Sequence, residues 1–145
     1  MIEVKVKKLD ENAKIPTRGS LNSAGYDLYA CLKEDVEIRP GNTVKIKTGI
    51  AIELPTSYVG LIFARSGLSI EKNLAPANKV GVCDSDYRGE YIVALRNGGD
   101  ISYFVKNGDR IAQLVVVPVL SLKFKEVESL SETKRGENGF GSTGV

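Results

Sequence analysis

Short segments of alternating apolar and polar residues constrain the fold of this chain more than any other feature. Residues 2–6 and 43–47 alternate, whereas 50–54 and 58–63 are short apolar runs, the first of which stops at Pro55. A period of two places every second side chain on the same face of a β-strand. Many short strands separated by turn residues predict an all-β sandwich or barrel.

The second half of the chain continues this pattern. The turn sequence at 97–100 lies between apolar runs at 91–95 and 101–105, which predicts a hairpin. Residues 111–119 are apolar almost throughout, which favours a strand covered on both faces. The one helix that we expect is short, near residues 66–72.

Length and composition favour one compact domain, whose core we expect to span residues 1–130. The chain has 145 residues, 42% of them hydrophobic, and a net charge of +2, which is too small to indicate a nucleic-acid or membrane surface. The alternating N-terminus predicts a strand and not a signal peptide. The chain has two cysteines, Cys31 and Cys83, which are too few for a four-thiolate metal site. We therefore expect a cytoplasmic protein with reduced thiols.

The chain contains no histidine. This absence excludes Ser-His-Asp and Cys-His catalysis, histidine-ligated zinc and an imidazole general base. Any acid–base chemistry must therefore use a carboxylate, a lysine or a tyrosine.

The C-terminal residues 131–145 are rich in glycine, which cannot hold a helix or strand without outside contacts. Arg135 could bind phosphate oxygens, Ser142 offers a hydroxyl, and Phe140 offers a flat surface for stacking on a base. The segment is interpreted as a mobile flap that closes over a nucleotide. A frayed terminus is the alternative.

Arg65-Ser66-Gly67-Leu68 follows directly on an apolar run. An arginine, a hydroxyl and a glycine at a strand end, opening a short helix, could bind an oxyanion or phosphate. The alternative is that Ser66 only caps the helix.

Residues 78–90 carry the other group of candidate residues. Val82 and Cys83 belong to an apolar stretch that predicts a strand leading to Asp84, a position where a carboxylate could orient a water molecule as general base. Asn78 could read the edge of a pyrimidine, and Tyr87 could pack against a sugar.

A purely structural interpretation of the same residues is the alternative. Asp84-Ser85-Asp86 could simply form the turn of a hairpin, since Asp and Ser side chains stabilise turns, and Arg88 and Glu90 could be ordinary surface charges. A calcium loop would need a glycine and a distal glutamate that the spacing lacks.

With two further segments, these motifs resemble the trimeric deoxyuridine triphosphate nucleotidohydrolases (dUTPases). The five matching segments are 24–28, 65–68, 78–89, 108–114 and 135–144. Each is a modest signal alone, but five in order at compatible spacing are highly specific. The resemblance implies a jelly-roll-like distorted β-barrel, a homotrimer, and hydrolysis of dUTP to dUMP and pyrophosphate.

The resemblance also implies active sites shared between chains. The first, second and fourth segments would come from one subunit, the third hairpin from another and the flap from the third. Asp84 would deprotonate the water that attacks the α-phosphorus in line. Asn78 and the backbone of Gly81–Cys83 would bind uracil, and Tyr87 would lie beneath the deoxyribose and leave no room for a 2′-hydroxyl.

The phosphate side of the site follows from the same resemblance. Arg65, Ser66, Gly67 and Gln113 fit the phosphate-binding and supporting positions. Asp27 would act only in the outer shell of Mg²⁺, which the triphosphate and water would coordinate directly.

The flap would complete the site by resemblance. Phe140 would cover the uracil ring, while Arg135, Ser142 and backbone amides such as that of Gly141 would close on the β- and γ-phosphates.

Two alternatives share the implied fold. A dCTP deaminase usually carries a second serine after the arginine-serine pair and a catalytic glutamate, whereas this chain has Gly67 and Asp84. A non-catalytic dUTP-binding regulator is disfavoured by the intact Asp84. Cys83 stands where isoleucine is more usual, which removes core volume beside this carboxylate.

Overall fold

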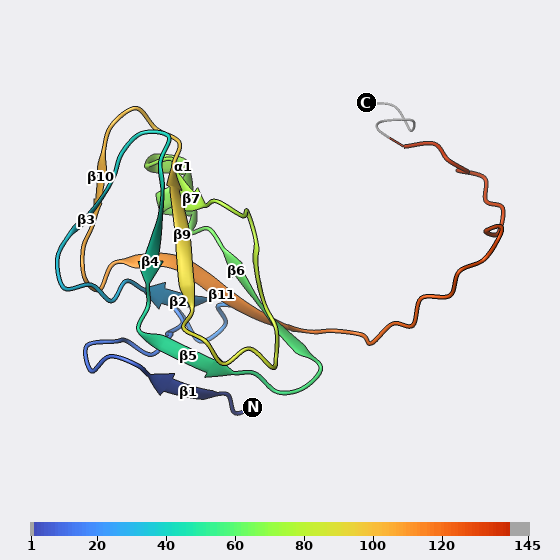
Figure 1. The fold of residues 1–145 in the computed structure, drawn as a ribbon, viewed down its shortest axis with the longest axis horizontal. Coiled ribbons are helices and arrows are strands. Elements are labelled where there is room, and N and C mark those ends of the chain that lie inside the picture. The colour runs from blue at the N-terminus through green and yellow to red at the C-terminus, as the bar shows by residue number, and fades with distance from the viewer. Residues whose placement is uncertain (1, 140–145) are drawn as a thin grey trace.

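The computed structural model describes residues 2–139, and these are built almost entirely of β-strands (Figure 1). The prediction of an all-β fold is therefore confirmed. In chain order, the elements are β1 (Lys5–Lys8), β2 (Tyr26–Tyr29), β3 (Val36–Ile38), β4 (Thr43–Lys47), β5 (Ile50–Glu53), β6 (Tyr58–Phe63), α1 (Ser66–Glu71), β7 (Leu74–Pro76), β8 (Gly81–Cys83), β9 (Ile92–Asn97), β10 (Tyr103–Val105) and β11 (Arg110–Pro118).

The strands pair in antiparallel fashion throughout the described residues. The largest sheet has the order β2-β11-β6-β8, and a second has the order β4-β9-β7. Two smaller sheets pair β1 with β5 and β10 with β3. These four sheets surround a common core and do not close into one continuous barrel.

Strand β11 is an inner strand of the largest sheet. Its apolar run predicted a strand covered on both faces, and Ile111, Ala112 and Leu114 are buried, whereas residues 115–117 are half-buried. The strand pairs with β2 on one side and with β6 on the other. Gln113 on β11 therefore lies opposite both Asp27 on β2 and Phe63 on β6. This register brings three segments that are distant in sequence to one edge of the molecule.

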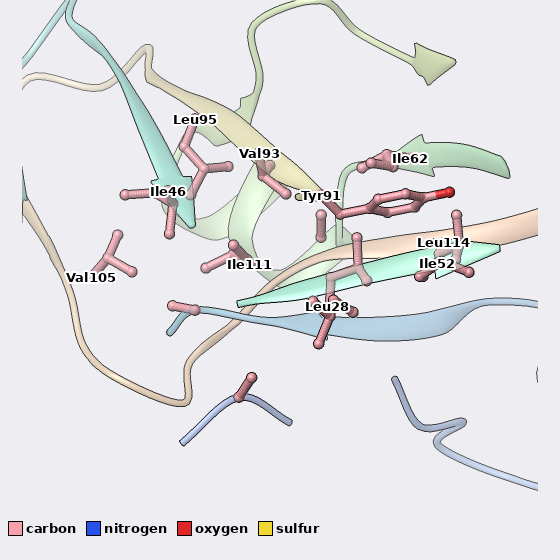
Figure 2. Close-up of a cluster of buried hydrophobic side chains, with 14 of the residues drawn as sticks. Leu28, Ile46, Ile52, Ile62, Tyr91, Val93, Leu95, Val105, Ile111 and Leu114 are labelled. Carbon is pink, nitrogen blue, oxygen red and sulfur yellow. The ribbon is translucent and has the colours of Figure 1, made fainter. Parts of the chain in front are cut away.

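The core is formed by side chains from several of the sheets (Figure 2). Leu28, Ile46, Ile52, Leu95 and Ile111 come from five different strands, and each is buried. Burial of one such side chain contributes about 1.5–3 kcal/mol. The alternation read from the sequence is the alternation between this core and solvent.

The predicted hairpin at 97–100 is wrong. Strand β9 pairs with β4 and β7, whereas β10 pairs with β3 in another sheet. The buried Asn97 explains the change of sheet, because its Nδ2 donates to Ile38 O at 2.8 Å and to Ile101 O at 2.7 Å. Its Oδ1 also accepts a hydrogen bond from Gly99 N at 2.9 Å. The side chain thus stabilises a turn that leads the chain from one sheet to the next.

The short helix is present as α1, close to its predicted bounds. Its N-cap is Arg65, which has an extended backbone and makes no side-chain capping hydrogen bond. Ser66 is the first helical residue, so the interpretation of Ser66 as a helix cap is wrong.

Residues 119–139 form an exposed arm that contains no helix or strand. Figure 1 shows this arm running away from the sheets after β11. Leu120, Leu122, Phe124 and Leu130 on the arm are exposed apolar side chains. No helix within residues 2–139 has the length and apolar character needed to cross a membrane.

Candidate active site

One cleft is formed where β2, β11 and the end of β6 meet, and we call it the arginine cleft. Its volume is about 470 Å³. It is lined by Gly19, Ser23, Ala24, Gly25, Asp27, Arg65, Ser66, Gly67, Arg110 and Gln113. The structure thus brings together the predicted residues of the first, second and fourth motifs.

Asp27 joins two arginines in this cleft. Its Oδ1 accepts a hydrogen bond from Arg65 Nε at 2.8 Å, and its Oδ2 lies 3.4 Å from an Nη atom of Arg110. An Nη atom of Arg65 also lies 3.5 Å from the carbonyl oxygen of Arg110. Two guanidinium groups against one carboxylate leave a net positive charge, which suits an anionic ligand.

Gln113 is fixed beside the second motif. Its Nε2 donates to the carbonyl oxygen of Ala64 at 2.8 Å. Ala64 is the residue before Arg65, so this bond holds the strand end from which the arginine projects. This bond fixes the side chain of Gln113 at the wall of the arginine cleft.

The residues of the third motif line a different cleft, which we call the Asp84 cleft. Its volume is about 270 Å³. It is lined by Ile62, Pro76, Asn78, Gly81, Val82, Cys83, Asp84, Tyr87, Glu90, Tyr91, Ile92, Val93 and Ala94. All six third-motif residues predicted for the site are among them.

Strand β8 supplies a backbone edge to this cleft. It is the outer strand of its sheet and pairs with β6, with Ile62 opposite Gly81 and Gly60 opposite Cys83. The opposite edge of an outer strand presents backbone donors and acceptors. Such groups suit recognition of the polar edge of a planar base.

The segment after β8 is a connection between two sheets and not a hairpin, which corrects the expected form of the third motif. We call residues 84–91 the β8–β9 loop. Strand β9 pairs with β4 and β7, so this loop spans the gap between the two largest sheets. Asp84 is exposed at its beginning, directly after β8.

Tyr87 turns back over the β8–β9 loop. Its amide donates to the carbonyl oxygen of Asp84 at 3.2 Å, and its hydroxyl donates to the carbonyl oxygen of Glu90 at 3.0 Å. The ring centroid lies 6.1 Å from that of Tyr91. These contacts keep an exposed aromatic face at the mouth of the cleft.

Cys83 is partly buried next to Asp84. Burial raises the pKa of its thiol above the ordinary value of 9.0, the nearby Tyr91 hydroxyl opposes this change, and the charge of Asp84 adds to it. A raised pKa keeps the thiol protonated and unreactive at neutral pH.

The two clefts share no lining residue, so the predicted site residues are separated within one chain. Arg135 lies in a third place, on the exposed arm, where its Nε donates to the carbonyl oxygen of Asn138 at 2.9 Å. Phe140, Gly141 and Ser142 lie outside the described residues.

A family model for dUTPases matches residues 11–144. The chain belongs to the dUTPase family. The deoxyuridine 5′-triphosphate nucleotidohydrolase of Desulfitobacterium hafniense (strain DSM 10664 / DCB-2) is 51% identical over all of this chain and 99% of the relative. The enzyme of the same name from Anaplasma marginale (strain St. Maries) is 42% identical, with both chains fully covered.

Solved structures of dUTPases from staphylococcal phages have the same fold. The dUTPase of Staphylococcus bacteriophage 80alpha, solved with dUPNHPP, has a TM-score of 0.92 at 33% identity, with both chains fully covered. A mutant dUTPase from phage phi11 of S. aureus, described with a structural Mg(II) ion, has a TM-score of 0.80 at 30% identity. That match covers 88% of this chain and 98% of the phage chain.

Sequence reasoning gave no role to several residues that line the clefts, among them Arg110, Glu90 and Tyr91. Arg110 lies inside the fourth matching segment, 108–114, but received no role. Its position directly before the apolar run at 111–119 is the signal that could have found it. Glu90 was weighed as an ordinary surface charge, yet its Oε1 accepts a hydrogen bond from Gly49 N at 2.8 Å. Nothing in the sequence indicated that the ring of Tyr91 lies near that of Tyr87.

Among the described residues, contact with Mg²⁺ through a bound water is more plausible chemically than direct ligation. Residues 2–139 contain no cluster of three or more His, Cys, Asp or Glu side chains that could hold a metal ion. Both oxygens of Asp27 already face guanidinium groups. A carboxylate oxygen keeps a second lone pair, so Asp27 can still accept a hydrogen bond from a metal-bound water.

Proposed function

We propose that this protein hydrolyses dUTP to dUMP and pyrophosphate by attack of an Asp84-activated water on the α-phosphorus. The observation that carries the proposal is the full-length match to dUTPases together with an exposed carboxylate at the end of β8. In a chain without histidine, a carboxylate is the side chain best suited to take the proton of the water.

We propose that the active site is assembled from several chains of a homotrimer. Separation of the site residues into two clefts without a shared residue supports this idea. The arm supports it as well, because Leu120, Leu122 and Phe124 expose apolar side chains with a period of two and have no strand beside them within residues 2–139. The arm would carry Arg135 to the site of another subunit.

Uracil and deoxyribose would bind in the Asp84 cleft. The side chain of Asn78 and the outer edge of Gly81–Cys83 would hydrogen-bond the base. Cytosine would leave buried polar groups unpaired, and such a mismatch is strongly disfavoured. Tyr87 would lie beneath the sugar and exclude a 2′-hydroxyl.

The triphosphate would bind in the arginine cleft. Arg65, Ser66, Gly67 and Gln113 would contact or support the phosphates. Mg²⁺, which neutralises phosphate charge, would be held mainly by substrate oxygens, with Asp27 accepting a hydrogen bond from its hydration water. The positive charge of this cleft disfavours a free cation but favours one that arrives with its triphosphate.

We also propose the division of the chain into a core at 1–130 and a flap at 131–145. The exposure of Arg135 supports a flap that folds onto a ligand. Because the last strand ends at Pro118, residues 119–130 would connect the sheets to this flap. Closure would exclude water and fix the triphosphate for in-line attack. The cytoplasmic location stays a prediction.

Incubation of the protein with Mg²⁺ and each of dUTP, dTTP, dCTP and UTP tests the activity. We expect pyrophosphate from dUTP alone. Ammonia released from dCTP would instead identify a deaminase, and binding of dUTP without cleavage would identify a regulator. Either outcome would overturn the proposal.

The role of Asp84 is tested by Asp84→Asn, with Asp86→Asn in the same loop as the control. Loss of a general base should lower kcat by about 10²–10⁴-fold. Affinity for a non-hydrolysable dUTP analogue should stay within about threefold, because the binding groups remain. Turnover near that of the parent would exclude Asp84 as the base.

A further inference from the structure

The C-terminal end of the β8–β9 loop is bound to the turn between β4 and β5. Gly49 N donates to Glu90 Oε1 at 2.8 Å. The buried Thr48 hydroxyl donates to the carbonyl oxygen of Tyr91, and Tyr91 N donates to the carbonyl oxygen of Ile50 at 2.9 Å. Of these bonds, the one from Gly49 is the only one that uses a side chain of the loop.

Gly49 is held in place from several directions. Its φ is +69°, and a Cβ atom there would lie 2.8 Å from Ala13 Cβ and 2.9 Å from Cys31 Sγ. Its carbonyl oxygen accepts a hydrogen bond from Leu9 N at 2.7 Å. The Gly49 amide is therefore a rigid donor, and a side chain bound to it is fixed relative to the core.

Glu90 connects this rigid donor to Tyr87. The Glu90 carbonyl oxygen accepts the Tyr87 hydroxyl at 3.0 Å. The ring lies against Gly89, where a Cβ would meet Tyr87 Cε2 at 2.8 Å, so a larger residue would displace it. Tyr87 is 44% exposed, and besides this hydrogen bond its ring faces Tyr91 at a centroid distance of 6.1 Å.

We propose that Glu90 is a positioning residue for recognition of the sugar. Its carboxylate fixes its own backbone on Gly49, its carbonyl then fixes the Tyr87 hydroxyl, and the tyrosine ring is thereby held where a 2′-hydroxyl would clash. This inference rests on the proposed function, in which Tyr87 lies beneath the deoxyribose. Glu90 acts through Tyr87 and needs no contact with the reacting atoms.

The test compares Glu90→Ala and Glu90→Gln by kcat and KM for dUTP and for UTP. Glutamine keeps an oxygen that can accept from Gly49 N, whereas alanine leaves that amide without its partner. We expect Glu90→Ala to lower the dUTP-over-UTP ratio of kcat/KM by about tenfold, the discrimination typical of one steric contact. Glu90→Gln should keep the ratio within about twofold of the parent.

The control is Asp86→Ala, which removes an exposed carboxylate from the same loop and should leave the ratio unchanged. Thermal unfolding of each variant shows whether it is folded. An unchanged ratio in folded Glu90→Ala, or an equal loss in Glu90→Gln, would overturn the proposal.

If Glu90→Ala does not fold, Tyr87→Phe tests the same connection. It removes only a hydroxyl from an exposed ring, and it breaks the last link to Glu90. We expect the ratio to fall severalfold, and an unchanged ratio would overturn the proposal. Failure of the parent to hydrolyse dUTP would instead contradict the proposed function, so the two failures are distinguishable.

Discussion

Replacement of Tyr91 by phenylalanine should stabilise the protein. Tyr91 is 1% exposed, and its hydroxyl is the one buried side-chain oxygen or nitrogen within residues 2–139 that has no hydrogen-bond partner. In the unfolded chain the same hydroxyl is bound to water. Folding therefore removes a hydrogen bond that no nitrogen or oxygen of the native structure replaces, and the nearby Cys83 thiol is at most a weak acceptor.

The size of the effect follows from this difference. An unsatisfied buried polar group costs about 1–3 kcal/mol, and Tyr91→Phe removes that cost. The mutation also loses a few dispersion contacts of the oxygen, each worth about 0.1–0.2 kcal/mol. We expect a net gain of about 1–2 kcal/mol in the free energy of unfolding. For a domain of this size the midpoint of thermal unfolding should rise by roughly 3–8 °C.

Thermal and urea unfolding at one protein concentration measure the change. Tyr87→Phe is the matched control, because it deletes a hydroxyl that has a partner in Glu90 and should be neutral or destabilising by up to about 1 kcal/mol. A loss of stability in Tyr91→Phe would refute the reasoning and indicate a bonded hydroxyl. The Cys83 thiol is then the candidate partner, since the two groups affect each other's pKa.

Three further predictions concern other parts of the molecule. Gly49→Ala should destabilise the protein by about 1–3 kcal/mol, because its φ is positive and the new methyl would overlap Ala13; an unchanged unfolding midpoint would contradict this. Burial raises the pKa of Tyr91 above its ordinary value of 10.0, so the folded state resists its ionisation, and the free energy of unfolding, unaffected by this group below pH 10, falls as pH rises from there towards the folded-state value. Urea unfolding between pH 9 and pH 11.5 should show a decline that is smaller in Tyr91→Phe. Finally, co-refolding Asp84→Asn chains with chains truncated before Arg135 should restore up to about one intact site in four by random assortment. A mixture that stays inactive would place both residues on one subunit.

The fold could be predicted as far as local pattern determines it. Alternation in 43–47 and the apolar run at 111–119 reflect burial on one face or on both, and the structure has β4 and β11 at these positions. Pairing could not be predicted in the same way. The turn at 97–100 has the composition of a hairpin, but the three hydrogen bonds of the Asn97 side chain direct the chain to another sheet. A distant acceptor such as Ile38 O leaves no local signal in the sequence.

The candidate site shows the same limit. The motifs at 65–68 and 78–89 identified part of the lining of each cleft, because their side chains carry the chemistry. The sequence did not reveal that Asp27 lies between two arginines, since Arg110 reaches it only through the register of β2 and β11. Glu90 was equally hidden, because its partner is a backbone amide far away in the chain.

The position of Pro118 has a practical consequence for anyone who purifies this protein. Every strand of the four sheets ends at or before this residue, while the exposed arm beyond it is an open target for contaminating proteases. A cut within 131–134 would detach Arg135 and leave both clefts whole. If Arg135 acts as proposed, such material would keep its circular dichroism spectrum and yet lose activity, so intact mass should be verified before any rate is measured.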